Sequence, residues 1–134
     1  KYPEAFWLLS TLPVRFRYLD EGSADLEATS SLIETNSHGE VIALRYNSRS
    51  AQAFTFPSEV MAEYYAAYRL LGELLHKPEA RIEFRLTPGQ LMILDNQRVL
   101  HGRSSYEEGS RHLQGCYADK DSLRSFIRVL EGEK

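Results

Sequence analysis

The chain has few of the features that mark secreted, membrane-spanning or nucleic-acid-binding proteins. Its 134 residues include one cysteine, Cys116, so an internal disulfide is excluded and a reducing compartment is favoured. No apolar run approaches the roughly 20 residues that span a membrane, and the first residues make a poor signal peptide. The net charge of −3 provides no basic field for nucleic acid. These absences predict a cytoplasmic globular protein that binds neither membrane nor nucleic acid.

Alternating apolar and polar residues predict several strands. The run Val14 to Leu19 alternates most clearly, and Asn36 to Gly39 has the composition of a hairpin turn. Cys116 is expected to pack in a core, on the far face of the last strand. The predicted strands are residues 14–19, 26–34, 40–46, 80–86, 91–94 and 111–117.

Three stretches have helical character. The chain begins with the end of a helix, PEAFWLLS, and a longer helix runs from a Ser58 cap to about His76. Its tyrosines are expected to serve packing or a dimer contact. A last helix covers residues 121–130, with Asp119 and Asp121 expected to cap it. Many strands and one long helix predict a mainly β protein with helices, half of a sandwich or jelly roll.

The residues that carry chemistry cluster between positions 96 and 117. His101 follows an apolar run directly, although a lone histidine is more often structural. Alternation places Arg111 and Tyr117 on one face of a strand, about 20 Å apart, with Gly115 between them. An arginine can bind a carboxylate with two hydrogen bonds, and a tyrosine ring can receive a quaternary ammonium group. Strands also mix such residues for packing alone, so the pattern by itself leaves both interpretations open.

The stretch DNQRVLHGRSSYEEGSRHLQGCYADKD resembles the C-terminal sequence of the γ-butyrobetaine hydroxylases. These are Fe(II)- and 2-oxoglutarate-dependent oxygenases of the taurine/2,4-D dioxygenase superfamily. The resemblance extends through PEAFWLLSTLPVRFRY, VIALRYNSRSAQAF and FRLTPGQLMILDN, over essentially the whole chain. It implies a double-stranded β-helix, or jelly roll, with one long insert helix. Residues 1–134 are expected to form the C-terminal portion of the catalytic domain, with the His-x-Asp metal motif upstream of residue 1.

The resemblance also implies roles for four residues. His101 is expected to be the distal ligand of a facial iron triad, and Arg111 to bind the 5-carboxylate of 2-oxoglutarate. Tyr117 is expected to join an aromatic cage around a trimethylammonium group, and Asn47 to make polar contacts with the substrate.

The implied reaction is the hydroxylation of γ-butyrobetaine to L-carnitine, which belongs to carnitine biosynthesis. It consumes O2 and 2-oxoglutarate, with ascorbate as reductant. We expect the 134 residues alone to be inactive, because the upstream segment of the same enzyme holds the other iron ligands. A homodimer through the tyrosine-rich helix is a further expectation.

Alternative interpretations remain open at this point. Trimethyllysine dioxygenase, which shares the quaternary ammonium substrate and much of the motif, or another superfamily oxygenase acting on a different small molecule, is the first alternative. A non-catalytic jelly-roll binding module is the second. Gly115 stands where sulfonate-using relatives place a second arginine, which favours a cationic substrate. The one His-x-Glu, His38-Gly39-Glu40, lies in a predicted turn, so we reject it as the metal motif.

Overall fold

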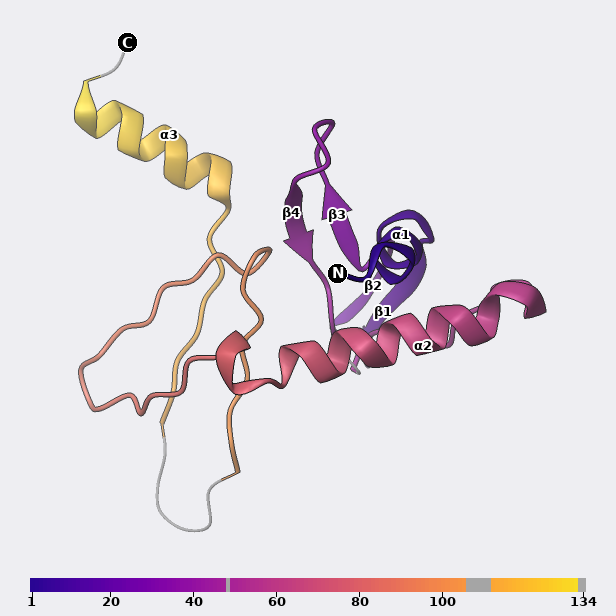
Figure 1. The fold of residues 1–134 in the computed structure, drawn as a ribbon. Helices are drawn as coiled ribbons and strands as arrows, with labels where there is room; N and C mark the ends of the chain where they lie inside the picture. The colour runs from indigo at the N-terminus through magenta and orange to yellow at the C-terminus, as the bar shows by residue number, and fades with distance from the viewer. Residues whose placement is uncertain (48, 106–111, 133–134) are drawn as a thin grey trace. The chain divides into compact units, whose positions relative to one another are not determined.

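The computed structural model describes residues 1–47, 49–105 and 112–132 and separates the chain into two units, residues 1–102 and 103–134 (Figure 1). Most of the regular structure belongs to the first unit. None of the helices within the described ranges is long and apolar enough to cross a membrane. The elements are α1 Pro3–Thr11, β1 Val14–Asp20, β2 Ala24–Ser30, β3 Ile33–Thr35, β4 Val41–Leu44, α2 Ser58–Leu75, the 3-10 turn η1 Pro78–Ala80 and α3 Lys120–Glu131.

The predicted first strand is confirmed as β1, which forms an antiparallel hairpin with β2. Ion pairs cross the exposed face of this hairpin, at 2.6 Å between Arg15 and Glu27 and at 2.9 Å between Arg17 and Asp25. The other edge of β1 pairs with residues 50–52, through bonds from the Arg17 amide to the Ser50 carbonyl and from the Gln52 amide to the Arg15 carbonyl. The segment that follows Asn47 is therefore tied to the sheet.

The prediction of one strand over residues 26–34 is wrong. The structure has two strands, β2 and β3, which are separated at Ser31 and Leu32. Leu32 is fully buried, and turning it into the core removes it from the ladder of the first hairpin. The predicted turn between β3 and β4 is confirmed, because the Asn36 Oδ1 atom accepts from the amides of His38 and Glu40.

The core of the first unit lies between α1, α2 and the strands. Tyr64 and Ala67 bring α2 into this core, so packing explains the apolar spacing of the helix. The prediction of Ser58 as the helix cap is wrong, because Pro57 occupies the cap position and Ser58 is already the first helical residue. The buried residues that form this core cluster are Leu8, Leu9, Val14, Phe16, Leu32, Ile33, Tyr64 and Ala67.

The strands predicted over 80–86, 91–94 and 111–117 are absent from the described residues of those segments. Their apolar side chains are exposed instead: Ile82 by 88%, Ile93 by 83% and Leu113 by 63%. A strand is stable when its amides and carbonyls pair with a neighbour, and the described part of the chain offers these segments none. The described architecture is a mixture of helices with two small antiparallel sheets. Figure 1 draws residues 81–102 without arrows.

The last helix, α3, begins at Lys120, one residue before the predicted start, and is capped by Asp119. The Asp119 carboxylate oxygen Oδ2 accepts a hydrogen bond from the Ser122 amide at 2.8 Å. Asp121 is not the cap, and it lies 3.5 Å from Arg124. Cys116, expected in a core, is exposed in the second unit, because the strand predicted to bury it is absent.

The cap makes a prediction about pH. The bond from Ser122 holds the pKa of the Asp119 carboxyl below its usual range. A lowered pKa means that the cap stabilises α3 above the ordinary aspartate pKa and is lost as the pH falls through the lowered value. We expect the Ser122 amide shift in NMR spectra to titrate below pH 3.8 in the parent chain. Asp119→Asn should remove this titration. A midpoint at the ordinary aspartate pKa in the parent chain would contradict the prediction of a lowered pKa.

Candidate functional site

His101 lies just beyond a turn that is bonded to β4. The Asp95 carbonyl accepts from the amides of Arg98 and Val99, which closes the turn. The Gln97 carbonyl accepts from the Leu44 amide at 2.8 Å. The Arg98 guanidinium donates to the Val41 carbonyl at 2.7 Å. These long-range bonds fix the chain three residues before His101, whose imidazole is exposed and available for a ligand.

The described residues do not by themselves fit a complete iron site. Within the described ranges, no group of three His, Cys, Asp or Glu side chains could hold a metal ion. A facial triad needs two histidines and a carboxylate, so His101 can supply one ligand of three. His38 lies in the Asn36 turn between β3 and β4, as expected for a turn residue.

Asn47 closes a turn with its side chain. Its Oδ1 atom accepts from both the amide and the hydroxyl of Ser50, each at 2.8 Å. A backbone amide is only a donor, so it must face the side-chain oxygen and not the nitrogen. The NH2 group takes no part in these two bonds and the Asn47 side chain is exposed, so this group can donate to an acceptor on a ligand.

The four sequence-predicted site residues are distributed over the chain. Asn47 and His101 belong to residues 1–102, whereas Tyr117 belongs to the second unit, where its side chain is 86% exposed. Arg111 lies outside the described residues. An exposed ring can receive a cation, but it forms no cage alone. The grouping of these residues into one site remains a prediction.

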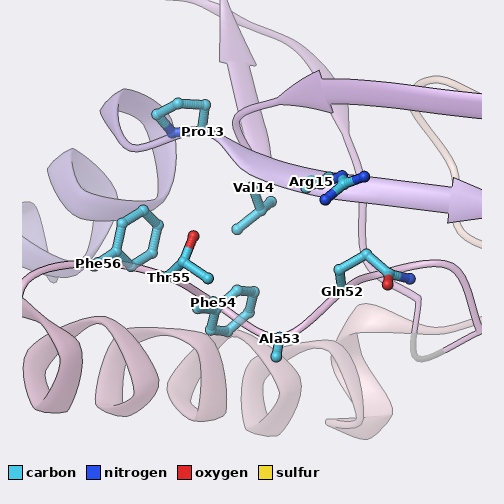
Figure 2. Close-up of a pocket in the computed structure, with 8 residues that line it drawn as sticks. All are labelled: Pro13, Val14, Arg15, Gln52, Ala53, Phe54, Thr55 and Phe56. Carbon is cyan, nitrogen blue, oxygen red and sulfur yellow. The ribbon is translucent and has the colours of Figure 1, made fainter.

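The structure contains a pocket that the sequence interpretation missed. It has a volume of about 270 Å³ and lies between the start of β1 and the segment before α2. Figure 2 shows Val14 and Phe54 in its middle, with Arg15 and Gln52 toward one end. The alternation of Phe54, Thr55 and Phe56 is the sequence signal that could have indicated that this segment lines a pocket. The lining residues are Pro13, Val14, Arg15, Gln52, Ala53, Phe54, Thr55 and Phe56.

This pocket contains none of the four predicted site residues and lacks a free charge. Its one ionic side chain, Arg15, makes two bonds to the Glu27 carboxylate, at 2.6 and 2.8 Å. The bond to Glu27 is the main reason that the pKa of Arg15 is raised. The pocket can accept apolar groups, but its described lining residues provide no general base that could activate the Thr55 hydroxyl as a nucleophile.

The sequence predicts packing contacts for Tyr64, Tyr65 and Tyr68 of α2, and the rings of all three lie against Phe54. The Tyr64 ring lies 4.8 Å from Phe54 and 4.5 Å from Phe56, between ring centroids. Burial raises the pKa of Tyr64 to about 12, and its hydroxyl has no hydrogen-bond partner among the described residues. Burial is the main cause of the raised pKa of Tyr68, and the neighbouring Tyr46 is the second cause. Neither phenol can act as a base near neutral pH.

Comparison with known proteins identifies relatives along almost the whole chain. Residues 1–117 match the model of the family described as "Taurine catabolism dioxygenase TauD, TfdA family". A γ-butyrobetaine dioxygenase from Pseudomonas sp. (strain AK-1) is 40% identical over 131 residues, which are 96% of this chain and 34% of the relative. The human γ-butyrobetaine dioxygenase is 36% identical over 134 residues, covering 96% of this chain and 35% of the relative.

A second group of relatives is somewhat less similar. The mitochondrial trimethyllysine dioxygenase from Bos taurus is 33% identical over 138 residues, covering 97% of this chain and 32% of the relative. The chain thus spans about a third of the length of the relatives it matches.

Proposed function

Because the chain belongs to the taurine catabolism dioxygenase TauD, TfdA family, we propose that it is part of an Fe(II)- and 2-oxoglutarate-dependent dioxygenase that hydroxylates γ-butyrobetaine to L-carnitine. The observation that carries the proposal is the 40% identity, over 96% of the chain, to a γ-butyrobetaine dioxygenase. The substrate is a small molecule with a quaternary ammonium group, and O2 is the co-reactant.

In this proposal residues 1–134 are the C-terminal portion of the catalytic domain, and an upstream segment of the same enzyme completes a jelly roll. This division is supported by the fact that the chain covers only about a third of the length of its relatives. The exposed apolar side chains of Ile82, Phe84, Leu91 and Ile93 also support it. Neighbouring strands would cover these side chains and pair with their backbone.

Each candidate residue has a role that its chemistry allows. The His101 imidazole would supply one iron ligand, and the Arg111 guanidinium would bind the distal carboxylate of 2-oxoglutarate. Tyr117 would contribute one face of an aromatic cage for the cation, and the Asn47 amide nitrogen would donate to the substrate. Bound iron and 2-oxoglutarate would supply the oxidising chemistry, while the protein positions the substrate.

Trimethyllysine hydroxylation is the second candidate function. It is favoured by 33% identity over 97% of the chain to a trimethyllysine dioxygenase. Both substrates carry a trimethylammonium group, so a Tyr117 contact does not discriminate between them. The difference in identity between the two groups of relatives favours γ-butyrobetaine.

Succinate release tests the proposal directly. The full-length enzyme that contains these residues is incubated with Fe(II), 2-oxoglutarate and ascorbate, and with γ-butyrobetaine or trimethyllysine. We expect γ-butyrobetaine to stimulate release and L-carnitine to accumulate in equal amount. Stimulation only by trimethyllysine would support the second candidate, and stimulation by neither would contradict both.

The 134 residues alone provide a control in the same assay. We expect them to release no succinate, because within the described ranges no second and third metal-binding side chain accompanies His101. Substrate-dependent release from this chain would contradict the proposed division of the iron site.

A further inference from the structure

Tyr46 is held against two residues of α2. Its ring stacks on Tyr68 with the centroids 4.9 Å apart and an angle of 25° between the planes. The tip of the same ring lies over Gly72, which is buried one helical turn further along α2. A Cβ atom at Gly72 would overlap the Tyr46 hydroxyl and would lie 3.2 Å from the ring carbon that bears it. The absence of a side chain at position 72 is therefore what admits Tyr46.

The residue after Tyr46 is Asn47, whose amide oxygen binds the amide and hydroxyl of Ser50. The Ser50 carbonyl in turn accepts from the Arg17 amide of β1 at 2.8 Å. The turn is thus fixed by the sheet on one side and by Tyr46 on the other. A shift of the Tyr46 ring would be transmitted to Asn47 through a single peptide link.

We infer that Tyr46, seated over Gly72 and stacked on Tyr68, is a positioning residue that orients the Asn47 amide for substrate binding. The inference rests on the proposed function, in which Asn47 contacts the substrate. Tyr46 acts on substrate binding only through Asn47. Its stacked aromatic ring is rigid, so it can fix the backbone at position 46 more firmly than a flexible side chain would.

Gly72→Ala tests the contact between Tyr46 and Gly72, because helix propensity predicts a gain in stability and packing predicts a loss. Alanine is the better helix former, so α2 would gain stability if nothing met the new methyl group. Ala66→Gly, on the exposed side of α2, measures the propensity effect alone. We expect Gly72→Ala to expel the Tyr46 ring and to lower the melting temperature.

The effect on Asn47 is measured in the full-length enzyme by two independent readouts. Hydrogen–deuterium exchange of peptides covering residues 46–52 should rise in Gly72→Ala, because Ser50 loses its protecting bond to Asn47. The KM for γ-butyrobetaine should rise about two- to tenfold, the range for losing one hydrogen bond, while the KM for 2-oxoglutarate stays unchanged. A general loss of structure would change both constants.

The double variant Tyr46→Phe/Gly72→Ala provides the matched rescue. Without the hydroxyl, two ring carbons at 3.2 and 3.9 Å face the new methyl group, and a small shift accommodates it. We expect exchange and the substrate KM to return toward the values of Tyr46→Phe. Tyr65→Phe, on the same helix, serves as the control for removing a hydroxyl.

Three results would overturn the inference: unchanged exchange and KM in Gly72→Ala, no rescue in the double variant, or altered exchange with an unchanged substrate KM. A parent enzyme inactive on γ-butyrobetaine would refute the proposed function and the positioning role with it. Exchange would then still report whether Tyr46 fixes the Asn47 turn, so the two failures can be distinguished.

Discussion

His101→Ala is expected to abolish the γ-butyrobetaine-dependent release of succinate by the full-length enzyme. Mutating a residue that hydrogen-bonds to a metal ligand typically lowers metal affinity or activity by about 10- to 100-fold. Losing the ligand itself should therefore lower activity by about 100-fold or more. His101 is exposed and lies just after the turn bonded to β4, so its removal should leave that turn and the fold intact. The melting temperature should therefore change little while activity disappears.

Iron content and activity are measured together, so that lost metal is separated from lost chemistry. His38→Ala is the matched control, because His38 lies in the Asn36 turn and has no role in the proposed site. His101→Ala with near-parent activity, or His38→Ala with an equal loss, would contradict the assignment of the distal ligand.

Tyr64→Ala is expected to destabilise the chain by about 3 to 5 kcal/mol, the range for removing a large buried ring. Tyr64 is fully buried, and its ring packs on Phe54 and Phe56. Tyr64→Phe should have the opposite sign and stabilise by about 1 kcal/mol, since it removes a buried hydroxyl that no described residue satisfies. Urea unfolding of the three chains measures both differences.

The parent chain and Tyr64→Phe should also differ in how their stability depends on pH. Burial raises the pKa of Tyr64 from 10.0 to about 12, so the folded state keeps its proton when the unfolded state has lost it. The stability of the parent should consequently fall between about pH 10 and 12, and Tyr64→Phe should lack that part of the fall. Tyr65→Phe, an exposed ring on the same helix, is the control. Destabilisation by Tyr64→Phe would contradict the absence of a partner for the hydroxyl.

Local patterns predicted the elements whose partners lie close in sequence. The alternation over residues 14–19, the turn at Asn36 and the stripe of α2 all correspond to observed elements. The hairpins β1–β2 and β3–β4 join neighbouring segments, and a helix satisfies its own backbone, so short-range signals suffice for them. The match to the family over residues 1–117 likewise agrees with the motif around His101.

The sequence alone determined the chemical types available here: one histidine after an apolar run, and an arginine, a tyrosine and an asparagine that the resemblance proposes as site residues. Tertiary structure decided what those residues contact. It buried Leu32 and divided a predicted strand, exposed Cys116, bound the Asn47 oxygen to Ser50 and seated Tyr46 on Gly72. The reason is physical: alternation shows that a segment can pair, but a strand or a site forms only where residues distant in sequence supply the other half.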